Sequence, residues 1–235
     1  MTDTLTNGVR ATDSDLVGRL RSQAERYHAA HPFHVRMNAG ELSPAQIRGW
    51  VANRFCYQEA IPIKDAAILS NCPDVAVRRR WIRRIVDHDG HDGVEGGIEA
   101  WLRLGEACGV PREEMLDHRH LVPAVRFAVD AYITFARTKP WTIAVASSLT
   151  ELFAPDLMAT RLAAFEKYYT WIDPEGLTYF RNRLHQAPRD SEHALEVVLE
   201  HCRTPETEQQ AYDALAFKND MLWAVMDGID HAYPA

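Results

Sequence analysis

The chain has 235 residues, of which 26 are basic and 33 are acidic, so its formal net charge is −7. Hydrophobic residues make up 46 % and charged residues 25 %, the balance of an ordinary globular protein, which excludes a disordered or collagen-like chain. A chain of this length can bury a sizeable core without disulfides or metal sites. The acidic charge argues against nucleic-acid binding, which usually requires a basic face.

Neither the N-terminus nor the cysteines indicate export or a membrane. No apolar run approaches the roughly 20 residues that cross a bilayer, and residues 1–6 lack the basic start and apolar core of a signal peptide. The cysteines are widely spaced and form no C-x-x-C pair, which is typical of reduced structural thiols rather than of a disulfide framework or a zinc site. They are Cys56, Cys72, Cys108 and Cys202. We therefore expect a cytoplasmic protein with no membrane partner.

Helix signals recur along the whole chain. Residues 43–46 (Ser-Pro-Ala-Gln) combine an N-cap, a proline at the first helical position and a capping-box glutamine. Apolar residues recur at helical spacing, as at Leu215 and Leu222, and we find no alternating strand with a hairpin turn. The predicted helices are 14–29, 43–70 (bent near Pro62), 74–88, 95–108, 122–137, 141–165 (disturbed near Pro155), 174–185, 189–202 and 205–232. We predict a single all-α domain over residues 1–235, a helical bundle with residues 1–12 as a flexible tail.

Polar side chains recur four residues apart at positions where a helical core is usually apolar. The pairs are Arg54 and Gln58, Arg84 and His88, and Tyr179 and Arg183. Lys64 follows the first pair on the same predicted helix, and Lys218 lies on the stripe that contains Leu215 and Leu222. If they face one cavity, they form a cationic pocket for a small molecule with several carboxylates, because Arg binds carboxylates through two parallel hydrogen bonds and Lys acts as a point charge. Each pair taken alone also fits a solvated face or an isolated ion pair.

A metal site is a second possibility. Glu25 and His28 supply one Glu-x-x-His unit, half of the pattern that binds two iron ions in helix bundles. The second unit does not occur, and only the Asp190 to His193 spacing approaches it. His88, in the Asp-His-Asp-Gly-His-Asp segment 87–92, fits an acid–base role better, because imidazole exchanges protons near neutral pH.

Several long segments occur together in a fixed order. They are Trp50–Phe55, Ile61–Ala67, Asp87–Gly90, Gly97–Leu102, Arg126–Tyr132 and Ser147–Pro155. Through these segments the chain, from about Tyr27 to Tyr233, resembles the pyrroloquinoline-quinone synthases, an all-helical family of the haem-oxygenase-like class. The resemblance implies ring closure and eight-electron oxidation of a bicyclic precursor by O2, with release of H2O2. It implies no metal and no cofactor, since the quinone is the product.

The resemblance also implies the site residues. The catalytic group would be His88, Tyr179, Arg183 and His28, and the substrate- or product-binding group would be Arg54, Gln58, Lys64, Arg84, Tyr132, Arg161 and Lys218. The cations would neutralise the carboxylates of a polyanionic substrate, and His88 would act as the base. Met158 stands where some members have a pocket histidine, so an acid–base role at that position must be absent or lie elsewhere.

The family suggests a homodimer and leaves open a pathway protein that delivers the precursor. Two other functions remain: a metal-dependent oxygenase on the same scaffold, and a carrier that binds the quinone without catalysis. Hydrolysis of the thiaminase type would need an activated cysteine, and no local pattern marks one.

Overall fold

The computed structural model describes residues 11–234, and this part of the chain is helical with no β-strand. The α-helices are α1 (Ala11–Ser22), α2 (Pro32–Ala39), α3 (Pro44–Asn71), α4 (Val75–Asp89), α5 (Gly97–Ala107), α6 (Arg112–Leu116), α7 (Pro123–Thr138), α8 (Trp141–Ala146), α9 (Ala154–Tyr168), α10 (Thr178–His201) and α11 (Pro205–Ala232). Four short 3-10 segments join them: η1 (Gln23–Arg26), η2 (His28–Ala30), η3 (Ser147–Leu152) and η4 (Pro174–Leu177). The all-α prediction is confirmed for the described residues.

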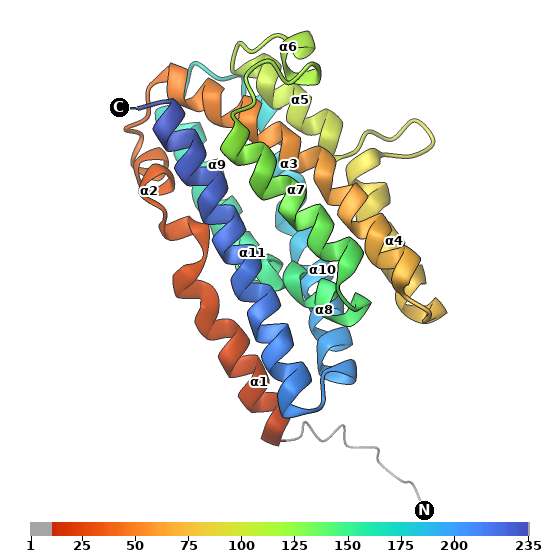
Figure 1. The fold of residues 1–235 in the computed structure, drawn as a ribbon. Helices are drawn as coiled ribbons and strands as arrows, with labels where there is room; N and C mark the ends of the chain where they lie inside the picture. Colours follow the sequence, from red (N-terminus) through yellow and green to blue (C-terminus); the bar gives the residue numbers. More distant parts are fainter. Residues whose placement is uncertain (1–10, 235) are drawn as a thin grey trace, which may run out of the picture.

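Three long helices form the centre of the bundle. Helix α7 packs against both α3 and α11, and α4 packs against the other side of α3 (Figure 1). Helices α9 and α10 pack against each other behind α11, and α1 lies against α11 (Figure 1). The large side chains Trp50, Trp101 and Phe180 are buried in the main core. None of the helices in residues 11–234 has both the length and the apolar character that a bilayer crossing requires.

Helix α3 begins where the sequence predicts. Ser43 Oγ accepts a hydrogen bond from the Gln46 amide at 3.3 Å, and Gln46 Oε1 accepts one from the Ser43 amide at 2.9 Å. This reciprocal capping box satisfies two amides that lack a helical partner. The helix continues through Pro62 to Asn71. It therefore carries five of the polar side chains that concern the site, from Arg54 to Asp65.

The prediction of a first helix over 14–29 is wrong. Helix α1 ends at Ser22, and the chain then makes two 3-10 turns, with Tyr27 extended between them. A second helix that the sequence did not reveal, α2, starts at Pro32. Proline disfavours a helical conformation at the residue before it, so His31 is extended and α2 begins as a separate helix. The predicted tail, residues 1–12, lies outside the described residues up to residue 10, and residues 11 and 12 belong to α1.

Two other boundaries differ from the prediction. The predicted helix 141–165 is divided by η3, whose Ser147 hydroxyl donates to the Ala144 carbonyl at 2.6 Å and tightens the turn. The predicted helices 174–185 and 189–202 are one helix, α10, which contains Pro188. Proline inside a helix removes one hydrogen bond. Contacts with other helices hold α10 on both sides of Pro188, since Phe180 packs against Phe165 of α9 and His201 packs against Trp141 of α8. The short helix α6 was not predicted.

Candidate active site

A small cavity lies among the 3-10 segments η2 and η3 and the helices α3, α4, α9, α10 and α11. Five of the predicted site residues line it: His28, Arg54, His88, Tyr179 and Arg183. Its volume is about 50 Å³, which is room for a few water molecules. A larger ligand therefore enters only if the lining side chains rearrange.

The other predicted site residues are buried around this lining and contact it. The Tyr179 hydroxyl donates to Gln58 Oε1 at 3.0 Å, and the Tyr132 ring stacks on that of Tyr57, with centroids 6.2 Å apart. The rest of this outer group are Lys64, Arg84, Arg161 and Lys218, all at most 3 % exposed. The structure thus brings all eleven predicted residues, from six helices and one 3-10 segment, into one buried region.

One group of cations in this region is neutralised by carboxylates. Arg84 Nη2 lies 2.6 Å from Glu151 Oε2, and Arg183 Nη2 lies 3.1 Å from Glu151 Oε1. Lys64 Nζ lies 2.6 Å from Asp65 Oδ1. Burial opposes the charge on the two arginines, but the carboxylates outweigh it and raise the pKa of Arg84 and of Arg183. These cations are held in place by the protein itself.

A second group of cations has no carboxylate partner within the described residues. Arg54, Arg161 and Lys218 are 8 %, 1 % and 1 % exposed, and none of them forms an ion pair. They lie against aromatic rings instead: Arg54 Cζ is 3.9 Å from the centre of the Tyr57 ring, and Arg161 Cζ is 5.0 Å from that of Trp50.

The polar atoms of this second group are also incompletely bonded. Arg161 Nε and Nη2 and Arg54 Nη1 have no hydrogen-bond partner in the described part of the chain. Burial is the main cause that lowers the pKa of Arg161 to about 9, and the charge of Arg54 adds to it. A buried cation without a counter-charge is costly. This half of the region therefore suits a ligand that brings anionic groups with it.

His88 is presented by the last turn of α4 as a neutral base. Its Nδ1–H donates to the Arg84 carbonyl at 2.9 Å, so its Nε2 carries the free lone pair. Burial, and then the positive charge of Arg183, lower the pKa of His88 to about 4. The first residue of α5, Gly97, packs so closely that a Cβ there would lie 3.4 Å from His88 and 3.5 Å from Tyr179.

His28 is a second neutral imidazole on the cavity wall. Its carbonyl accepts a hydrogen bond from His34 Nδ1–H at 2.8 Å, and its own Nδ1 has no partner among the described residues. Burial and the neighbouring His34 lower the pKa of His28 well below the ordinary value. The edge of the Tyr27 ring packs against it, with centroids 4.5 Å apart.

Sequence reasoning missed several residues of the site. Tyr27, Tyr57 and Glu151 line the cavity, and Asp65 and Asp190 pair with the buried cations. Tyr57 follows Arg54 by three residues on one helix face, which is a signal that the sequence does contain. Glu151 could not be found in this way, because its place depends on the 3-10 segment η3. Met158 lines the cavity as well.

The cysteines and the acidic clusters do not gather at the cavity. Burial raises the pKa of the Cys56 thiol to about 11, and none of the four cysteines lines the cavity, so a thiolate nucleophile has no support. Within residues 11–234 no three side chains of His, Cys, Asp or Glu come together as metal ligands. In particular, Glu25 is exposed whereas His28 is buried.

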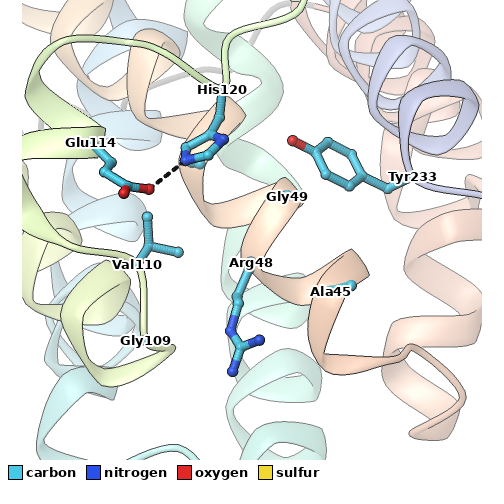
Figure 2. A pocket seen from close by; sticks show the side chains of 9 residues that line it. Ala45, Arg48, Gly49, Gly109, Val110, Glu114, His120 and Tyr233 are labelled. Atoms are coloured by element: carbon cyan, nitrogen blue, oxygen red, sulfur yellow. Dashed lines mark hydrogen bonds and ion pairs between the residues drawn. The ribbon is translucent and has the colours of Figure 1, made fainter.

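A larger hollow of about 250 Å³ lies near the start of α3, beside the chain after α5 (Figure 2). Its polar groups are already paired: Arg48 Nε–H donates to the Cys108 carbonyl at 2.8 Å, and His120 Nε2 lies 2.7 Å from Glu114. Tyr233 closes one side against Gly49 (Figure 2). None of the predicted site residues lies in this hollow.

Solved structures of other proteins have the same fold as this chain. Two solved structures share the fold: a TenA homologue from Pseudomonas syringae (TM-score 0.77, 15 % identity, 97 % of this chain and 100 % of that one) and a domain of unknown function with a haem-oxygenase-like fold from Shewanella denitrificans (TM-score 0.79, 13 % identity, 96 % and 94 %). At these identities they establish the fold alone.

Sequence relatives are much more similar. The chain is 54 % identical over 222 residues to the pyrroloquinoline-quinone synthase of Cronobacter sakazakii, which covers 94 % of this chain and 88 % of the relative. It is 56 % identical over 214 residues to that of Pseudomonas aeruginosa, covering 91 % and 86 %. The model of the TENA/THI-4/PQQC family matches residues 18–228. The chain therefore belongs to the TENA/THI-4/PQQC family and, within it, to the pyrroloquinoline-quinone synthases.

Proposed function

We propose that the protein catalyses the last step of pyrroloquinoline quinone biosynthesis, the ring closure and eight-electron oxidation of the bicyclic precursor. In this proposal O2 accepts the electrons, H2O2 is released, and neither a metal nor an organic cofactor takes part. The names of the relatives, at 54 % and 56 % identity, support the role in this pathway. The residues of the cavity support the chemistry.

The observation that carries the proposal is the group of buried basic side chains without acidic partners in the described part of the chain. Arg54, Arg161 and Lys218 lie within one region, and a substrate with several carboxylates supplies the missing negative charge. Positive charge beside the substrate rings also stabilises the carbanion that forms when a ring C–H loses its proton. We assign the removal of such protons to His88, which lines the cavity and whose Nδ1–H is already bonded to the Arg84 carbonyl.

We assign oxygen reduction to the part of the cavity lined by Arg183 and Tyr179. Arg183 and Tyr179 line it together with His88, and a guanidinium and a phenol O–H both stabilise a developing superoxide or peroxide anion. Once deprotonated, the substrate is itself electron-rich and can reduce O2. The donor side chains needed for a metal centre do not gather within the described range, which favours the metal-free route over the di-iron alternative.

We propose further that the protein acts as a homodimer in the cytoplasm. Phe127 on α7 and Ile63 on α3 are 72 % and 45 % exposed on two helices that pack against each other. A second subunit packed over these helices would remove both side chains from water, which supports the proposal. The molar mass in solution, measured by light scattering, tests this point, and we expect twice the chain mass.

The function is tested with protein that has been freed of metals by chelation and given the bicyclic precursor in air. We expect the quinone to form together with H2O2. Activity that returns only after iron is added would support a metal-dependent oxygenase instead. Tight binding of the quinone without any turnover would leave the carrier function.

A further inference from the structure

The side chain of Lys218 ends in the protein interior without a carboxylate beside it. Its only hydrogen-bond partner among the described residues is the hydroxyl of Tyr57, 2.6 Å from Nζ. The same Nζ lies 3.3 Å from the centre of the Tyr132 ring. Lys64, the other buried lysine, has an acid partner in Asp65. Lys218 is thus held by a phenol and an aromatic face, and no carboxylate is there to balance a charge on its amine.

The elements packed against α11 place both signs of charge around this amine. The groups that face it are Tyr57, Arg54, Lys64 and Asp65 on α3, Tyr132 on α7, Glu151 on η3 and His28 on η2. Arg19 on α1 and Arg26 on η1 pair with Glu208 and Asp220 at other points of α11, and α8 has no titratable side chain.

The balance of these influences opposes a charge on the amine. Burial is the largest of them, and Lys64 and Arg54 add to it, while the more weakly acting Glu151 and Asp65 do not restore the balance. Together they lower the pKa of Lys218 well below its ordinary value. This agrees with the contacts, since a phenol oxygen and a ring face replace neither water nor an acid as partners of an ammonium group.

We propose that Lys218 is uncharged in the free site and takes up a proton from water when a carboxylate of the ligand binds, with Tyr57 positioning its amine. The proton adds to the lone pair of Nζ, and the ammonium group then donates to the ligand carboxylate and to Tyr57 Oη. Guanidinium groups hold their protons much more firmly than amines do. Of the three basic side chains without an acid partner, we assign the change of charge to Lys218, because it is the one that carries an amine.

This inference rests on the proposed function, because the ligand must bring the carboxylate. Its test is calorimetric titration of the protein with pyrroloquinoline quinone at pH 8.5, in buffers that differ in ionisation enthalpy. The dependence of the observed enthalpy on the buffer gives the number of protons exchanged. We expect the wild type to take up about one proton per bound quinone, because the ligand raises the pKa of the amine.

Variants assign this proton to its residue. Lys218→Met should lose the uptake, and Lys218→Arg should bind without uptake, because arginine is charged before the ligand arrives. Tyr57→Phe keeps the packing of the ring but removes the oxygen that accepts from the ammonium group. It should therefore weaken binding several-fold and shift the loss of affinity at high pH to a lower pH. Lys167→Met is the matched control, because Lys167 also donates to a tyrosine hydroxyl, that of Tyr168, but on the exposed face of α9.

The outcomes separate this inference from the function on which it rests. Binding by the wild type with no proton uptake would overturn the inference alone. So would uptake that persists unchanged in Lys218→Met, which would point to Arg161, His28 or His88. If the wild type does not bind the quinone at all, the proposed function fails and the inference fails with it.

Discussion

At the scale of single residues, the basic side chains of the site differ in a way that residue type does not reveal. Arg84 and Arg183 share Glu151, whereas Arg54 and Arg161 have no acid partner in the described part of the chain. The first two are fixed by the protein, and in the proposed function the second two bind the ligand. His88, close to Arg183, is a neutral base.

This division of roles predicts different effects of two substitutions. His88→Ala should lower kcat by about 100-fold or more, the usual contribution of a general base, with product binding largely unchanged. Arg54→Ala should weaken product binding by about 10- to 100-fold, the loss of one hydrogen bond to a charged group in a buried site. Steady-state kinetics and titration with the quinone measure both. Equal losses of binding in the two variants, with no separate effect on turnover, would count against these roles.

The neutral imidazole of His88 also makes the stability depend on pH. Its pKa is about 4 in the folded protein against an ordinary value of 6.5, so between these values the unfolded state binds more protons and stability falls as the pH falls. Between pH 7 and pH 4.5, the free energy of unfolding of His88→Gln should therefore fall by about 2 kcal/mol less than that of the wild type. Denaturant unfolding at both pH values measures this difference, and parallel curves for the two proteins would show that folding does not lower the pKa of His88.

At the scale of elements, helix α3 carries the largest share of the site. Its capping box at Ser43 and Gln46 sets where it begins and hence the direction in which Arg54, Gln58 and Lys64 project. Ser43→Ala should lower the free energy of unfolding by about 1 kcal/mol, as measured by urea unfolding. Ser43→Asp keeps an acceptor at the N-cap and should remain close to the wild type. A full loss in both variants would mean that the cap is not the cause.

Helices with strong local signals could be predicted, and those set by packing could not. Helix α11 follows its cap at Thr204 and Pro205 and has the predicted bounds. The division at η3 and the continuity of α10 through Pro188 depend on contacts with other helices, which local propensity does not contain. The consequence for the site is specific, because η3 is the segment that brings Glu151 to the buried arginines.

At the scale of the whole molecule, the site joins segments that lie far apart in the chain. Lys218 meets Tyr57 across 161 positions, and Tyr179 meets Gln58 across 121. Spacing within a helix indicated which side chains share a face, but it could not show which faces meet. Spacing indicated eight of the eleven candidate residues, the Glu-x-x-His unit indicated His28 as a metal ligand, and Tyr132 and Arg161 came from the family resemblance alone. The pairing of their charges with Asp65, Glu151 and Asp190 became visible only in the folded chain.

The central claim is that the unpaired buried cations are where the carboxylates of the quinone bind. A crystal structure with bound pyrroloquinoline quinone tests it most directly. We predict carboxylate oxygens within hydrogen-bond distance of Arg54, Arg161 and Lys218, with Arg84 still held by Glu151. A quinone bound in the hollow beside Arg48, or with its carboxylates turned away from all three cations, would contradict the claim.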